Sequence, residues 1–421
     1  MAKNKIIAGI ELGSSKIATV ISQVGLDSTT FETNINVVGV SSSHSKGVRK
    51  GQIVDIDEAV EATIESVEAA ERMAGYNLDS AFVSLGGAHL HSQNSHGVVA
   101  VSDPDGEISP DDVGRVIEAA SAISIPASPE IVHVIPREFN VDGEAGVRDP
   151  VGMSGVRLEV GTHIITCSAS AVKNLKKAIN EVGVNIEEIV FSGLAASEAV
   201  LTSTEKELGC VLVDLGGGTT SIAAFVDGSI SYSSVLPLGS KNVTNDLAIG
   251  LRVSLESAER IKLALGSENK KKDNKEGDDL NLEDLGISEV KKVSKRTLVE
   301  GIIRPRLNEI FTMVRLDLDR ENLNNRVPSG VIVTGGGAET VGVIESAKRM
   351  LSLPVRIGVP QGVGGLIDDV INPGFAIPIG LVLYGAKSET LVASSSFSKK
   401  LKLPSKGIMG RLTDMVKDLL P

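Results

Sequence analysis

The sequence predicts an α/β protein that carries a small α+β insert and ends in a separate amphipathic helix. Two units share one design, in which an apolar strand, an acidic residue, a glycine- or serine-rich turn and a second apolar strand follow one another. Between residues 82 and 162 the sequence pattern changes to short Val-rich strands, which indicates the insert. With 421 residues, 42% of them hydrophobic and only 3% aromatic, the chain is long enough for roughly two to four domains with aliphatic cores.

The first unit lies near the N-terminus. Strands are predicted over Ile6–Glu11 and Lys16–Ile21, with residues 12–15 as the turn between them. An amphipathic helix is predicted over Asp57–Ala74, because its apolar residues recur with the helical period and Gly75 follows as a stop.

The insert is predicted to hold several short strands around one helix. Ser109 and Pro110 form a typical helix start. After the insert, a strand over His163–Ser168 and a helix that stops at Gly183 are predicted. The predicted strands of the insert region are Ala81–Leu85, Val98–Val101, Glu130–Phe139 and Val156–Val160.

The second unit repeats the first, with strands over Cys210–Asp214 and Ser221–Val226. A third strand, over 330–334, leads through a glycine triplet into a helix. Residues 268–286 are charged and poor in apolar side chains, so we expect an exposed loop there. Residues 387–405 are rich in Ser and Lys and are typical of a linker.

The two turns are suited to binding an anion. Successive backbone N–H groups without side chains cradle a phosphate closely. The acidic residue before each turn, Glu11 or Asp214, cannot bind phosphate, but it can hold the hydrated Mg²⁺ that accompanies a nucleotide. One glycine-rich turn alone is usually only a tight turn, whereas two such units and a third triplet together favour a nucleotide site. The turns lack the Walker A spacing and lead into strands, so neither a P-loop nor a Rossmann fingerprint is present.

Composition excludes several other functions. Lys and Arg number 42 against 54 Asp and Glu, a net charge of −12, which argues against a general nucleic-acid binder. The two cysteines, Cys167 and Cys210, form no disulfide framework and are expected to be buried and inert. His89, His91 and His96 fall in a Ser/Asn/Gly-rich segment that we interpret as a surface loop rather than a metal site.

The N-terminus lacks the features of a signal peptide, and the longest apolar run, 375–386, is too short to span a bilayer.

The last residues are predicted to form an amphipathic helix that follows a Lys-containing stretch. Such a helix suits adsorption to an anionic membrane surface, and docking onto its own domain or onto a partner is the alternative. Its apolar face consists of Ile408, Met409, Leu412, Met415, Val416, Leu419 and Leu420.

Three stretches resemble the actin/Hsp70/sugar-kinase superfamily: the turn around Gly13, VDLGGGTTSIAAF at 213–225 and GVIVTGGGAETVGVIESAKRML at 330–351. Within it, FSGLAASEAVLTSTEKELGCVLVDLGGGT (191–219), RTLVEGIIRPRLNEI (296–310) and VRIGVPQGVGGL (355–366) are similar to the FtsA family of bacterial cell-division proteins. The resemblance implies an actin-like fold of two lobes with ATP between them. It divides the chain into lobe 1 at 1–81 and 163–193 (subdomain 1A), the insert at 82–162 (1C), lobe 2 at 194–240 and 301–374 (2A), subdomain 2B at 241–300, a return to lobe 1 at 375–390, a flexible linker at 391–406 and a membrane-targeting helix at 407–421.

The same resemblance implies roles for individual residues. Glu259 and Lys262 would contact ribose and adenine, although a solvated i,i+3 ion pair is the alternative. Glu11 departs from the Asp that is usual in the superfamily, and its extra methylene is expected to alter the Mg²⁺ geometry or the hydrolytic step. The implied phosphate contacts are Gly13, Ser14, Ser15 and Lys16 from one lobe and Gly216, Gly217, Gly218 and Thr219 from the other, with Gly335, Gly336 and Gly337 under the adenosine.

The resemblance also implies a function, which is to anchor the FtsZ ring to the cytoplasmic face of the membrane at the division site and to self-associate into filaments. ATP would act mainly as a conformational and assembly ligand, with slow hydrolysis at most, because no well-placed general base stands out. Arg306 and Glu309, next to a basic stretch, would bind the C-terminal peptide of FtsZ, and the insert would bind later division proteins.

Two other classes of function stay open at this point. A small-molecule kinase with the same turns would need a catalytic Asp near a substrate pocket, and none can be located. An Hsp70-like chaperone would need a C-terminal substrate domain, and the residues after 386 are too few for one.

Overall fold

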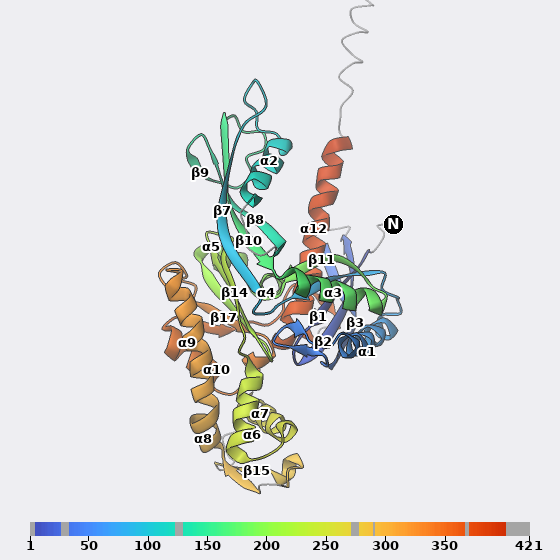
Figure 1. The fold of residues 1–421 in the computed structure, drawn as a ribbon, viewed down its shortest axis with the longest axis vertical. Helices are drawn as coiled ribbons and strands as arrows, with labels where there is room; N and C mark the ends of the chain where they lie inside the picture. Colours follow the sequence, from blue (N-terminus) through green and yellow to red (C-terminus); the bar gives the residue numbers. More distant parts are fainter. Residues whose placement is uncertain are drawn as a thin grey trace, which may run out of the picture.

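The computed structural model describes residues 5–26, 33–122, 129–270, 278–288, 291–366 and 370–400. Two lobes, each built on a β-sheet, lie side by side in the middle of the molecule (Figure 1). The insert extends from one end of this body, a helical region extends from the other, and the C-terminal helix rises on the same side as the insert (Figure 1).

The sheet of lobe 1 contains both strands of the first predicted unit. The first two strands pair antiparallel, and the first strand also pairs parallel with β6, which places the acidic residue at the end of a central strand. In spatial order the strands are β11 (Asn185–Phe191), β6 (Ser80–Leu85), β1 (Lys5–Leu12), β2 (Lys16–Leu26), β3 (Thr33–His44) and β19 (Gly364–Gly365). A short ribbon of β4 (Val48–Arg49) and β5 (Gln52–Ile53) follows β3 in the chain.

The sheet of lobe 2 repeats the first five strands of lobe 1 in the same spatial order. Here β12 pairs antiparallel with β13 and parallel with β17, as β1 does with β2 and β6. Listed in the direction used for lobe 1, the strands are β18 (Val355–Ile357), β17 (Val331–Thr334), β12 (Cys210–Leu215), β13 (Thr220–Val226) and β14 (Ser229–Leu236). The two predicted units are therefore equivalent parts of two similar lobes.

Helices pack on both faces of each sheet. Two of them, α4 and α12, lie between the sheets, in a core that contains buried residues of both lobes such as Val20 and Leu212. The outer face of lobe 1 is covered by α1 and α3, and that of lobe 2 by α9 and α10. The helices are α1 (Ile56–Ala74), α3 (Ala169–Val182), α4 (Ser192–Val200), α5 (Ser203–Leu208), α9 (Arg304–Arg320), α10 (Val343–Leu351) and α12 (Ala376–Lys400).

The region at the far end of lobe 2 is mostly helical and shares the core of that lobe. Leu280 and Leu282 are buried there together with Ile261. It consists of α6 (Ser240–Leu251), α7 (Leu255–Lys270), β15 (Asp279–Asn281), β16 (Lys292–Ser294), α8 (Lys295–Leu298) and a π-helical turn over Val299–Ile303.

The insert has its own four-stranded sheet, with one helix packed against it and a small separate core around Leu158 and Val116. The capping box predicted at Ser109 is present, because Ser109 and Asp112 exchange side-chain and backbone hydrogen bonds. The elements are β7 (Leu90–Ala100), β10 (Arg157–Cys167), β8 (Glu130–Val141), β9 (Glu144–Val147) and α2 (Pro110–Ser121).

The predicted limits of the insert need correction. The strand over Ala81–Leu85 belongs to lobe 1, because β6 pairs with β1 and β11. The two strands predicted at 156–160 and 163–168 are one strand of the insert, β10, and a bulge between Gly161 and Thr162 interrupts its pairing with β8. The insert therefore runs from β7 to Cys167 instead of from 82 to 162.

Other local predictions were also wrong. His91 and His96 lie in strand β7 rather than in a loop. Part of the segment 268–286 is ordered structure, because α7 extends to Lys270 and β15 follows at 279. The predicted linker is helical up to Lys400. Strands β3, β11 and β14 were not predicted.

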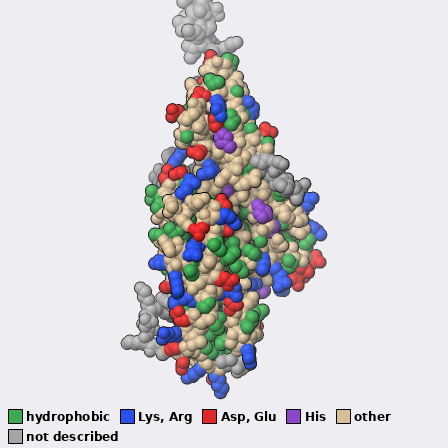
Figure 2. All heavy atoms as spheres, turned by 60° about the vertical axis from the view of Figure 1, so that its left-hand side comes forward, with side chains coloured by type: hydrophobic (Ala, Val, Ile, Leu, Met, Phe, Trp, Pro, Cys, Tyr) green, Lys and Arg blue, Asp and Glu red, His purple; other side chains and the backbone are tan. Residues whose placement is uncertain are grey.

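The two cysteines are buried, as expected, and burial raises the pKa of each thiol to about 12. Among the described residues, no helix combines the length and the apolar character needed to cross a membrane. The tail residues proposed for membrane contact, 408–420, lie outside the described residues. On the face drawn in Figure 2, cationic and anionic side chains are intermixed.

Candidate functional site

The two predicted turns lie face to face between the lobes. The same hydrogen bond closes both, from Gly13 N to Lys16 O (3.0 Å) and from Gly216 N to Thr219 O (2.9 Å). A Cβ atom added at Gly217 would lie 2.8 Å from Ser15 Cβ, which is closer than real Cβ atoms approach. The turns therefore meet so closely that glycine is needed at this position.

Further contacts join the lobes at Ser14. Lys241 Nζ of α6 donates to Ser14 O (2.6 Å), and Gly51 N donates to Ser14 Oγ (2.9 Å). Gly218 packs against the same residue, because a Cβ atom added at Gly218 would lie 2.8 Å from Ser14 Cβ. Ser14 is thus held from both lobes.

A cavity of about 780 Å³ opens beside the two turns. This volume falls in the range of small-molecule sites. Gly218 is the one predicted cofactor residue that does not line it, since Gly218 packs on Ser14. The predicted residues that line the cavity are Glu11, Gly13, Ser14, Ser15, Lys16, Asp214, Gly216, Gly217, Thr219, Glu259, Lys262, Gly335, Gly336 and Gly337.

Two carboxylates occupy the strand ends inside the cavity. Burial raises the pKa of Glu11 to about 7, and burial together with the charge of Glu11 raises the pKa of Asp214 to about 7. Oε2 of Glu11 is buried and has no hydrogen-bond partner in the described part of the chain. A buried carboxylate oxygen without a partner is costly, so the pair is prepared for a proton or a cation.

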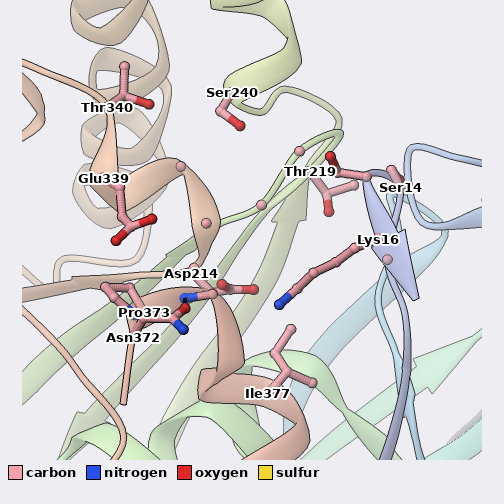
Figure 3. Close-up of a pocket in the computed structure, with 18 of the residues that line it drawn as sticks. Ser14, Lys16, Asp214, Thr219, Ser240, Glu339, Thr340, Asn372, Pro373 and Ile377 are labelled. Atoms are coloured by element: carbon pink, nitrogen blue, oxygen red, sulfur yellow. Dashed lines mark hydrogen bonds between the residues drawn. The ribbon is translucent and has the colours of Figure 1, made fainter. Parts of the chain in front are cut away.

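Lys16 is the cation whose charge opposes the rise in pKa of both carboxyls. Its side chain extends across the cavity toward Asp214 (Figure 3), and its Nζ lies 3.7 Å from the centroid of the Phe375 ring. Burial lowers the pKa of Lys16, whereas the charges of Glu11, Asp214 and Glu339 oppose that shift. One lysine faces two carboxylates, which leaves the site able to accept further positive charge.

The predicted pair on α7 has a buried lysine and a half-buried glutamate, whose side chain is 38% exposed. Lys262 Nζ donates to Glu259 Oε2 (2.8 Å) and to Thr244 Oγ1 (3.0 Å), and Lys262 is only 5% exposed. Thr244 on α6 also donates to Glu259, so both side chains are fixed at the cavity wall. This arrangement does not match an ordinary surface ion pair.

The glycine triplet brings a loop against the end of β12. Gly335 has a φ of +82°, and its N–H donates to Pro373 O (3.1 Å). A Cβ there would overlap the carboxylate of Asp214, and a Cβ at Gly337 would lie 2.5 Å from Leu215 Cγ. Only glycine allows this close approach.

Several cavity residues were not predicted from the sequence. The turn Asn372–Gly374 at the start of α12 forms one wall, as Figure 3 shows for Asn372 and Pro373. An Asn-Pro-Gly run is a typical turn signal and could have drawn attention. The other unpredicted lining residues include Ser84, Gly86, Ser192, Ser221, Ser240, Arg260, Leu263, Gly266, Ser267, Leu285, Glu339, Thr340 and Ile377.

The predicted partner residues lie outside the cavity, on α9. Arg306 binds both oxygens of Asp246 on α6, through Nε (2.6 Å) and Nη2 (2.9 Å). It also pairs with Glu309 one turn along the helix. Arg306 is therefore part of the contact between α6 and α9 and remains partly exposed.

The cavity fits Mg²⁺ in its donor chemistry. Mg²⁺ takes oxygen ligands at one or two carboxylates and keeps several waters. Glu11 and Asp214 supply the carboxylates, and the unpartnered Oε2 of Glu11 is the kind of atom that such a hydrated ion would satisfy. The two glycine-containing turns lie beside these carboxylates, and such turns are suited to binding an anion.

Comparison with solved structures defines the class of the fold. The chain is similar to a structure of the PilM–PilN type IV pilus biogenesis complex, with a TM-score of 0.63 and 16% identity over 90% of this chain and 98% of that one. It is also similar to MreB5 of Spiroplasma citri bound to ADP, with a TM-score of 0.53 and 13% identity over 92% and 98% of the two chains. The protein has the actin-like two-lobed fold with an insert, as predicted.

Sequence relatives define the family within this class. The model "SHS2 domain inserted in FTSA" matches residues 87–166, and the model "Cell division protein FtsA" matches 211–380. The chain is 37% identical to the cell division protein FtsA of Pseudomonas aeruginosa over 94% of this chain and 92% of that one. It is 32% identical to FtsA of Escherichia coli K12 over 91% of each. The chain belongs to the FtsA family of cell division proteins.

Proposed function

We propose that this protein binds ATP with Mg²⁺ between its lobes and uses that state to assemble on the membrane as an anchor for FtsZ. The observation that carries the nucleotide part is that two equivalent turns and two buried carboxylates converge on one cavity. MreB5, which has a similar fold, has been solved with ADP and with AMPPNP. Membership of the FtsA family favours this function over a kinase or a chaperone.

ATP would act here as a conformational ligand. Phosphates held by both turns link the lobes at the point where Gly217 meets Ser15. A ligand shifts a conformational equilibrium only by its difference in affinity between the two states. Because the cradle is complete only when the turns face each other, ATP would favour the closed, assembly-competent arrangement.

Asp214→Ala should weaken ATP binding in Mg²⁺ by about 10- to 100-fold, the range for the loss of a supporting metal contact. Binding in EDTA should change much less, since the carboxylate repels phosphate when no cation is present. Calorimetric titration under both conditions measures the difference, and Asp214→Asn, which keeps the shape, should behave like Asp214→Ala. An equal loss in Mg²⁺ and in EDTA would mean that Asp214 is only structural.

The proposed FtsZ contact rests on the family relationship and on α9. Arg306→Glu should weaken binding of the FtsZ C-terminal peptide by roughly tenfold or more, because a charge-assisted contact is reversed, and ATP affinity should stay unchanged. Fluorescence anisotropy with labelled peptide measures this. Arg304→Glu is the control, since Arg304 pairs with Glu300 in the preceding π-helical turn and not with α6 among the described residues. A peptide affinity unaffected by Arg306→Glu removes this residue from the site.

Later division proteins would bind the insert.

The tail, residues 407–421, would be the membrane anchor. Met415→Glu places a charge in the apolar face of the tail, so binding to anionic vesicles should fall by roughly tenfold or more. Co-sedimentation with vesicles measures this. Gly410→Glu adds the same charge outside the apolar face and should bind much like the parent chain. Full pelleting of Met415→Glu would contradict the anchor.

Filament formation would strengthen this attachment. A single helix of this length binds reversibly, whereas many tails on one polymer bind at high effective concentration. Membrane attachment and self-association are therefore expected to depend on each other, at the cytoplasmic face of the division site.

A further inference from the structure

The insert contacts both lobes, although the chain connects it only to lobe 1, between β6 and α3. At its base, Leu90 and Ile165 are buried in the core between the lobes. On the lobe 1 side, His133 Nε2 accepts a hydrogen bond from Phe191 N (3.0 Å). On the other side, β7 and β10 lie against β14, the edge strand of the lobe 2 sheet (Figure 1). Any movement of one lobe relative to the other must therefore change one of these contacts.

Polar side chains of the insert bind the backbone of β14. Asn94 Nδ2 donates to Ser231 O (3.1 Å). Ser92 Oγ donates to Ser233 O (2.6 Å) and accepts from Ser233 N (3.2 Å). An edge strand leaves such backbone groups without a partner strand. The insert thus covers the free edge of the lobe 2 sheet with side chains.

His163 of β10 completes this network. It is only 1% exposed, and both of its ring nitrogens are bound, Nδ1 by Asn94 Oδ1 (2.8 Å) and Nε2 by Ser233 Oγ (3.0 Å). Burial is the main cause that lowers the pKa of His163 to about 3, so the ring is neutral at pH 7. Because the oxygen of Asn94 can only accept, Nδ1 carries the proton and Nε2 accepts from Ser233.

Two further contacts flank this network. Arg148 Nη2 donates to both carboxylate oxygens of Glu207 on α5 (2.7 Å each). Ser229 Oγ of β14 donates to Arg137 O (3.0 Å). However, Arg137 Nε and Ser231 Oγ are buried in this region without a partner among the described residues. Buried polar atoms without partners weaken a contact, so the insert is held on lobe 2 by a contact that can be released.

We propose that the insert is a clamp across the two lobes, docked on β14 when the lobes are closed and released from β14 when they open. Docking of the insert and binding of Mg²⁺-ATP then favour the same closed arrangement, so each raises the affinity of the other by the same factor. The inference rests on the proposed nucleotide site and gives the insert a regulatory role at that site.

Hydrogen exchange with mass spectrometry on the full chain, with and without Mg²⁺-ATP, tests the clamp. In the parent chain, Mg²⁺-ATP should slow exchange at 229–236 as well as at 12–16. Asn94→Ala removes two hydrogen bonds, so exchange at 229–236 without nucleotide should be about tenfold faster, and the calorimetric affinity for Mg²⁺-ATP should fall about 3- to 10-fold. His96→Ala is the control, since His96 lies on the same strand but contacts Glu159 within the insert (3.1 Å).

Ser92→Ala, which also removes hydrogen bonds to β14, is the second variant if Asn94→Ala does not fold. If the parent chain does not bind ATP, the proposed nucleotide function fails, and the clamp fails with it. If ATP binds and protects 12–16 but leaves 229–236 unchanged, only the clamp is overturned. Faster exchange at 229–236 in these variants with an unchanged affinity for ATP would make the contact merely structural and also overturns the clamp.

Discussion

Gly380→Ala is expected to destabilise the protein by about 3 kcal/mol or more, the upper range for overpacking. Gly380 lies where α12 crosses α4, and an added Cβ would overlap the backbone carbonyl of Ala195. Because that carbonyl belongs to a helix packed between both sheets, it cannot move aside without separating the lobes. Helix propensity alone predicts the opposite sign, a gain of about 1 kcal/mol.

Urea unfolding followed by circular dichroism measures this effect. Gly114→Ala in α2 is the matched control, since Gly114 is also helical but has no atom within 4 Å of the added Cβ. It should be neutral or stabilising. If both variants unfold at the same urea concentration, the close crossing of α4 and α12 is not a feature of the folded protein.

Gly217→Val is expected to reduce ATP affinity by at least about 100-fold, because several hydrogen bonds to charged phosphates are lost together. The added side chain would collide with Ser15, because even a Cβ atom added at residue 217 would lie 2.8 Å from Ser15 Cβ. The two turns would be pushed apart, and the phosphate cradle would lose one side.

Isothermal titration with Mg²⁺-ATP measures the loss, and circular dichroism shows whether the variant folds. Gly114→Ala again serves as the control and should bind as the parent does. An unchanged affinity in a folded Gly217→Val protein would place the phosphates somewhere other than between these turns.

The sequence predicted the parts of the site that are local in the chain. Each turn and its acidic residue are neighbours in the chain, so their sequence pattern alone indicates that they lie together in the folded protein. Ser84, Ser192 and Ser221 were not predicted, because they come from three separate elements that only the strand order of the two lobes brings together. No local pattern distinguishes these serines from ordinary strand-end residues.

The errors in the fold also have physical causes. Strand β10 is continuous in its pairing with β7, but Gly161 in its middle is a typical strand-ending signal, so one strand resembles two. The strand β6 resembled those of the insert in composition, and only its pairing with β1 assigns it to lobe 1. In α12, a well-packed first half lets the helix continue into a Ser- and Lys-rich segment, because adding residues to an existing helix is easier than starting one.

The central claim is that one Mg²⁺-ATP binds both lobes at once. Hydrogen exchange with mass spectrometry, on the full chain with and without Mg²⁺-ATP, tests it most directly. Slower exchange is expected together in four segments: 12–16, 215–219, 259–267 and 335–340. Protection in the turn of only one lobe, or no protection in either turn while ATP is bound, would contradict the account.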